Sequence, residues 1–86
     1  MKLNKNFLVH KTGGETVVVP TGNADFSGIV KGNKTLGAIL DLMKNDTDEQ
    51  QIIDAMAERF EAPRDVIEKD VANVIIKLRS IGAIDE

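Results

Sequence analysis

The chain has 86 residues, of which 42% are hydrophobic and 29% are charged, a composition typical of a soluble globular domain. A chain this short needs most of its length for one core, so we expect a single domain over residues 1–86. The absence of cysteine excludes a disulfide framework and thiolate chemistry. Because the sequence has neither a signal-peptide pattern nor an apolar run that could span a bilayer, we expect a cytoplasmic protein without a membrane partner. The 14 acidic and 11 basic residues give a net charge of −3, which disfavours nucleic acid as a partner.

The N-terminal part of the sequence predicts strands. Runs rich in β-branched residues place three of them at residues 6–12, 15–20 and 26–31. The pair Gly13-Gly14 fits a tight hairpin turn with positive φ at both positions, so the first two strands should pair antiparallel. Gly28 interrupts the third strand and is expected to form a bulge or a point of close approach.

After Asn33 the apolar period changes from two to about 3.6 residues, which predicts helices. The first helix is expected to start with Asn33 or Thr35 as its N-cap. The second should start at a capping box, in which the Thr47 hydroxyl accepts from the amide of Gln50 and the Gln50 side chain reaches back. The apolar faces consist of Leu36, Ile39, Leu40 and Met43 in the first helix and of Ile52, Ile53, Met56, Ala57 and Phe60 in the second.

A third helix is expected from about residue 63 to residue 81, with Pro63 in its first turn and Gly82 as its stop signal. Its core stripe consists of Ile67, Val71, Val74, Leu78 and Ile81, with Ile75 at the edge. Ile76 falls on the opposite side of the helix, among polar residues. A single exposed apolar residue is common, so Ile76 is either an ordinary surface residue or part of a contact surface.

No catalytic or metal site can be assembled from these residues. Residues 28–35 follow the phosphate-loop pattern between a strand and a helix, but Asn33 stands where the pattern requires glycine, and the chain is too short for an NTPase sheet. A calcium loop starting at Asp46 would lack the obligatory glycine and the bidentate glutamate. His10 is the only histidine and is expected to be an ordinary strand residue. We therefore expect no enzymatic activity, no metal and no cofactor.

Three strands and three helices in a chain of this size also suit a winged helix, in which the third helix would read DNA. The third helix carries acidic and basic residues in similar numbers, namely Asp65, Glu68 and Asp70 against Arg64, Lys69, Lys77 and Arg79. It offers no net positive face and no stacking aromatic residue. A DNA-binding or scaffolding domain of this fold is the alternative interpretation.

Three motifs follow one another along the chain. Residues 26–35 read Phe-Ser-Gly-Ile-Val-Lys-Gly-Asn-Lys-Thr. This stretch resembles the PqqD-like family, which reads Phe-x-Gly, an apolar pair and Leu-Asn-x-Thr before a helix. Residues 47–53 are similar to the family's Thr-x-Glu-x-Ile start of the second helix. Residues 70–84 are similar to its closing pattern of Asp-Val, an apolar pair, Leu and Gly-Leu-Ile. The chain departs from the family at Gly32, where Leu is usual, and at Leu40, where Trp is usual.

The resemblance implies an α+β, winged-helix-like fold, with an N-terminal three-stranded antiparallel sheet followed by a three-helix bundle. It also implies a non-catalytic peptide chaperone. Such a domain captures the leader of a ribosomally made precursor peptide and presents it to a modifying enzyme, often a radical SAM protein, as in coenzyme PQQ synthesis. An exposed edge strand suits this role, because a peptide can add to it as a further strand. The implied peptide-binding residues are Phe26, Ser27, Gly28, Ile29, Val30 and Lys31 in the third strand, and Lys69, Asn73, Ile76, Lys77 and Ser80 on the outward face of the third helix.

Overall fold

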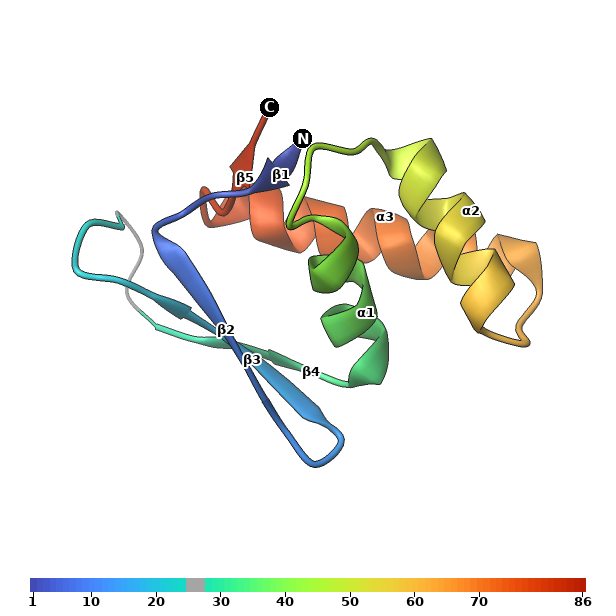
Figure 1. The fold of residues 1–86 in the computed structure, drawn as a ribbon, viewed down its shortest axis with the longest axis horizontal. Helices are drawn as coiled ribbons and strands as arrows, with labels where there is room; N and C mark the ends of the chain where they lie inside the picture. The colour runs from blue at the N-terminus through green and yellow to red at the C-terminus, as the bar shows by residue number, and fades with distance from the viewer. Residues whose placement is uncertain (25–27) are drawn as a thin grey trace.

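A computed structural model describes residues 1–24 and 28–86. In chain order, its elements are β1 (Lys2–Leu3), β2 (Phe7–Thr12), β3 (Glu15–Pro20), β4 (Val30–Gly32), α1 (Lys34–Leu42), α2 (Glu49–Arg59), α3 (Arg64–Ser80) and β5 (Ile84–Asp85). Strands β2, β3 and β4 form an antiparallel sheet in that order, and α1 packs on all three of them (Figure 1). The predicted α+β arrangement of an antiparallel sheet followed by three helices is confirmed.

The hairpin between β2 and β3 has the expected two-residue turn. Thr12 pairs with Glu15, which leaves Gly13 and Gly14 as the loop. Only Gly13 has a positive φ, of 60°, so the expectation of positive φ at both glycines is wrong. A positive φ at the first loop position alone is the pattern of a type II′ turn, which matches the twist of the two strands as well as the type I′ turn does.

The third strand of this sheet is shorter than the sequence predicts. Residues 26 and 27 lie outside the described residues, and Gly28 and Ile29 lie outside β4. Gly28 has a φ of 126°, which is incompatible with the extended conformation of a strand, so pairing starts only after it. At the other end, Gly32 still pairs with Thr16, and β4 therefore ends one residue later than expected.

A second, two-stranded sheet joins the beginning and the end of the described chain. Strands β1 and β5 pair antiparallel through Lys2 with Asp85 and Leu3 with Ile84. The turn that ends α3 makes this possible, since Gly82 adopts a φ of 75° and the amide of Ala83 donates to a carbonyl of the last helical turn at 2.9 Å. The predicted stop at Gly82 is confirmed, whereas the small sheet was not predicted.

The first two helices begin at side-chain caps. The Asn33 side chain accepts from two amides of the first turn of α1, at 3.0 and 3.4 Å, so Asn33 and not Thr35 is the cap. In α2 the cap is Asp48, whose carboxylate accepts from the amide of Gln51 at 2.8 Å. The predicted capping box at Thr47 is therefore wrong. A carboxylate is the stronger acceptor, and the Thr47 hydroxyl instead donates to the Gln51 side chain at 3.1 Å.

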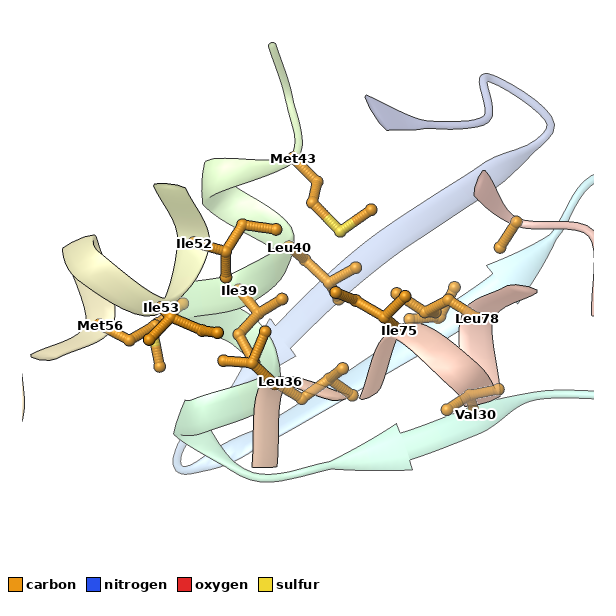
Figure 2. Packing of buried hydrophobic residues seen from close by; sticks show 14 of the residues in the cluster. Val30, Leu36, Ile39, Leu40, Met43, Ile52, Ile53, Met56, Ile75 and Leu78 are labelled. Atoms are coloured by element: carbon orange, nitrogen blue, oxygen red, sulfur yellow. The ribbon is translucent and has the colours of Figure 1, made fainter. Parts of the chain in front are cut away.

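The core lies between the sheet and the three helices (Figure 2). Its largest fully buried side chains are Ile39, Leu40, Met43, Ile52, Met56, Ile75, Leu78, Val18 and Val71. In α3 the buried stripe is rotated from the predicted one, because Ile75 lies at its centre while Val74 and Ile81 are only half-buried. The cause is tertiary packing, since α2 packs against α3, while Val74 borders an open groove. Within residues 1–24 and 28–86, no helix has the length and hydrophobicity needed to cross a membrane.

Candidate functional site

A groove with a volume of about 380 Å³ lies between β4 and α3. One wall consists of Val30, Lys31, Gly32, Asn33, Thr35 and Leu36, from β4 and the start of α1. The other wall consists of Asp70, Asn73, Val74, Lys77 and Leu78 from α3. These five residues recur at helical spacings of three and four, so they form one continuous stripe along the helix.

The floor of the groove is apolar. Val30, Leu36 and Leu78 contribute side chains that are almost fully buried. Gly32 is required here, because a Cβ atom at this position would lie 2.5 Å from Cδ2 and 2.9 Å from Cβ of Leu36. Any side chain at Gly32 would displace Leu36, so the glycine lets β4 run directly into α1 with Leu36 against it.

Strand β4 borders the groove with an edge that carries no partner strand among the described residues. Its register is with β3 alone, through Thr16 with Gly32, Val17 with Lys31 and Val18 with Val30. In a strand, alternate residues turn their N–H and C=O groups to opposite sides, so part of the β4 backbone faces away from β3. Such an edge is a template for pairing with another extended chain.

The rim of the groove is charged, and the charges are separated. Asp70 lies in the first half of α3, and Lys77 lies in its last turn. Lys31 lines the opposite wall, on β4. Within residues 1–24 and 28–86, none of these three side chains takes part in an ion pair.

Ion pairs that shift pKa values lie outside the groove. Lys11 donates to Asp41 at 2.5 Å and Arg64 donates to Asp54 at 2.5 Å, and in each pair the hydrogen bond lowers the pKa of the carboxyl. These pairs connect β2 with α1 and α2 with α3. A carboxyl with a lowered pKa is a poor proton carrier near neutral pH, and each of these pairs links two elements of the fold. No group of three or more residues suited to holding a metal ion occurs within the described part of the chain.

The structure brings together only some of the residues that the sequence assigned to peptide binding. Val30, Lys31, Asn73 and Lys77 line the groove. Gly28 and Ile29 precede β4, and the Ile29 side chain is 51% exposed. Three further residues, Lys69, Ile76 and Ser80, are exposed on a strip of α3 that lies beside the groove stripe. Phe26 and Ser27 fall outside the described residues.

Sequence reasoning missed much of the groove lining, namely Gly32, Asn33, Thr35, Leu36, Asp70, Val74 and Leu78. A signal for part of this set was present, because Asp70, Val74 and Lys77 have the spacing i, i+4, i+7 that places them on one side of a helix. The predicted outward face was instead centred on Ile76. On a helical wheel, Ile76 lies about 100° from Lys77, its neighbour in sequence.

Comparison with known proteins agrees with this geometry. A family model described as coenzyme PQQ synthesis protein D (PqqD) matches residues 15–84. The chain belongs to the PqqD family. The match confirms the resemblance seen in the sequence, and it includes both walls of the groove. No curated protein sequence matches this PqqD-family chain significantly.

Two solved structures share the fold of this PqqD-family chain. One is "TbiB1 in Complex with the TbiA(beta) Leader Peptide", with a TM-score of 0.78 and 15% sequence identity over 99% of this chain and 95% of that one. The other is "Lasso peptide synthetase B1 complexed with the leader peptide", with a TM-score of 0.72 and 17% identity over 95% of this chain and 93% of that one. The strand order and the three following helices are therefore a fold that these proteins have in common.

Proposed function

We propose that this PqqD-family chain is a non-catalytic peptide chaperone that captures the leader of a ribosomally made precursor peptide. The observation that carries the proposal is the edge of β4, which has no partner strand among residues 1–24 and 28–86, beside a groove with an apolar floor. Two proteins of the same fold were solved as complexes with leader peptides, which supports the same ligand class here. Residues 1–86 act together as one recognition domain in this proposal.

The peptide adds to β4 as a fourth strand of the sheet. Strand addition provides main-chain hydrogen bonds, which are independent of sequence, while pockets for side chains provide specificity. Because β4 has only three residues, few such hydrogen bonds are available, and the wall formed by α3 must contribute the rest of the affinity. The site therefore needs both walls of the groove.

The captured leader is presented to a modifying enzyme in the cytoplasm. A radical SAM protein or another modifying enzyme performs the chemistry, since the groove itself holds no nucleophile–base pair among its lining residues. The role of this domain is to raise the concentration of the precursor near that enzyme.

Nuclear magnetic resonance tests the proposal directly. The probe is a synthetic leader peptide from a short precursor reading frame that neighbours the gene, added to the ¹⁵N-labelled protein. Amide signals from Gly28 to Gly32 should shift, because strand addition pairs backbone groups that were open to water, and those of Asn73 and Lys77 should shift with them. Saturable shifts confined to the Gly13–Gly14 hairpin or to α2 would place the site elsewhere and contradict the proposal.

A further inference from the structure

The three-stranded sheet has a second face, which points away from α1. Side chains alternate between the two faces of a strand. Thr16, Val18 and Val30 belong to the face that α1 covers, since they are buried and since Gly37 of α1 lies against Thr16. Their neighbours along each strand turn to the other face, which we call the outer face. Its strand residues are Leu8, His10 and Thr12 of β2, Glu15, Val17 and Val19 of β3, and Lys31 of β4.

The outer face carries apolar side chains where the exposed face of an antiparallel sheet is usually polar. Leu8 lies directly opposite Val19, and Val17 is the next outward residue of β3. Leu8 is 54% exposed, and both valines are half-buried. Valine is common in strands because its branched side chain suits a pleated surface, but leucine has no such preference. Strand propensity therefore does not explain an exposed Leu8 at this place.

Two basic side chains flank this apolar cluster. The register places His10 and Lys31 on either side of Val17, in one row across the sheet. Lys31 also borders the groove, but alternation turns its side chain to the outer face. The carboxylate among these strand residues belongs to Glu15, which lies at the hairpin end. The outer face thus matches a partner surface that is apolar and carries a carboxylate opposite Lys31.

The size of the outer face argues against a second copy of the chain as its occupant. Strands β2 and β3 have six residues each, which corresponds to about 20 Å, and three strands are about 10 to 14 Å wide. The face therefore covers about 200 to 300 Å², whereas a stable interface buries about 800 Å² on each partner. Two copies that meet through this face alone would not form a stable dimer.

The outer face continues into the place where a captured peptide would lie. A strand added to β4 extends the sheet, so every second side chain of the peptide projects on the outer face beside Lys31. A partner seated on the outer face can extend its contact onto the peptide, and this added contact enlarges the interface. The partner with a reason to touch both surfaces is the enzyme that acts on the peptide.

We propose that the outer face docks the modifying enzyme, through an apolar surface of that enzyme with a carboxylate that pairs with Lys31. This inference rests on the proposed function, because it requires a peptide held on β4. The groove lies on the Val30 side of β4 and the outer face on the Lys31 side. The domain therefore holds the peptide from one side of the sheet and is recognised by the enzyme from the other.

A binding assay with the purified enzyme tests the docking site. The probe is the modifying enzyme encoded beside the precursor reading frame, titrated onto the leader-loaded protein in biolayer interferometry. Leu8→Asp should bind the enzyme about ten-fold more weakly, because a charge replaces the apolar side chain at the contact. Val66→Asp is the matched control, since Val66 is similarly exposed, on α3, and lies outside both the groove and the outer face. It should bind the enzyme as the wild type does.

Two substitutions of His10 test the charge of the partner surface. His10→Glu places a carboxylate beside Val17 and should weaken enzyme binding about two- to five-fold, whereas His10→Lys should strengthen it by a similar factor. Both effects should shrink as the sodium chloride concentration rises. His10 is exposed, so the melting temperature of both variants should stay close to that of the wild type. The opposite order of affinities would overturn the acidic partner surface.

The outcomes separate this inference from the proposed function. If the leader-loaded wild type does not bind the enzyme, or if folded Leu8→Asp binds it equally well, the docking site is overturned and peptide capture stands. A dimer of the wild type in light scattering that Leu8→Asp dissociates would assign the outer face to a second copy and overturn the proposal. If the leader peptide does not bind the wild type, peptide capture fails and this inference fails with it.

Discussion

Ile76 is the clearest case of a residue whose environment could be predicted from pattern alone. The helical wheel placed it away from the core, and its side chain is 64% exposed. It lies beside the groove stripe of α3 and does not line the groove itself. Its role in binding stays a prediction. A peptide side chain that projects over α3 from a strand on β4 would cover Ile76 and remove its apolar surface from water.

Ile76→Asp should weaken leader-peptide binding about ten-fold, because loss of a buried apolar contact costs about 1 to 3 kcal/mol. The melting temperature should remain nearly the same, since the exposed side chain contributes little to folding. Isothermal titration and thermal melts measure the two effects. Leu8→Asp is the control, because Leu8 is 54% exposed on β2, the opposite edge of the sheet from β4. Unchanged peptide affinity in folded Ile76→Asp would show that the peptide does not reach this strip.

At the scale of elements, Gly37 lets α1 approach the sheet closely. A Cβ atom at this position of α1 would lie 2.7 Å from Oγ1 of Thr16, on β3. The Thr16 side chain is β-branched and only 2% exposed, so it has little freedom to move away. The glycine therefore sets the distance between α1 and the sheet.

Gly37→Ala should destabilise the protein although alanine is the better helix former. The gain in helix propensity is about 1 kcal/mol, whereas overpacking of a tight contact costs about 1 to 3 kcal/mol. We expect a net loss of about 1 kcal/mol in the free energy of unfolding by urea, which corresponds to a fall of about 4 to 8 °C in melting temperature.

The double variant Gly37→Ala/Thr16→Ala provides the control. Removing Oγ1 of Thr16 makes room for the added methyl group, so Gly37→Ala should be less destabilising in the Thr16→Ala background than in the wild type. Equal effects of Gly37→Ala in both backgrounds would show that the Thr16 contact is not the cause. If Gly37→Ala alone made the protein more stable, the close approach of Gly37 to Thr16 would be contradicted.

The elements that the sequence predicts well are those with a local cause. Asn33 caps α1 and Gly82 ends α3 because short-range hydrogen bonds and a positive φ decide both boundaries. Strands β1 and β5 have two residues each, too few for any periodicity to be read, and they exist because distant segments meet. The start of α2 was misplaced by one residue since Thr47 and Asp48 are both good caps, and only the course of the preceding chain selects between them.

The groove could be predicted only in part for a similar reason. Periodicity alone separates the buried side of α3 from the exposed side, but it does not reveal which exposed stripe faces β4. That depends on where β4 begins, and Gly28 with a φ of 126° delays the strand to Val30. Leu36 and Leu78 follow the apolar pattern of core residues. No feature of the neighbouring sequence indicates that these two side chains also line the floor of a groove.

At the scale of the whole molecule, the distribution of charge bears on the winged-helix alternative. In a winged helix the third helix would need basic side chains available for phosphates. In α3, Arg64 pairs with Asp54, and Arg79 pairs with Glu86 at 2.6 Å. These hydrogen bonds raise the pKa of both arginines and lower the pKa of both carboxyls, so each pair stays charged and its two charges offset each other.

We therefore predict no saturable binding of duplex DNA at physiological salt. Two of the four basic residues of α3 are engaged by acidic partners, and Asp65, Glu68 and Asp70 add negative charge along the same helix. With a net charge of −3 for the chain, phosphate contacts cannot supply the counterion release that drives non-specific binding. Fluorescence anisotropy with labelled duplexes measures this, and a leader peptide that binds the same preparation shows that the protein is active. Submicromolar binding to a defined duplex, weakening steeply with salt, would instead favour the DNA-binding interpretation, because only a segregated basic surface could produce it on an acidic chain.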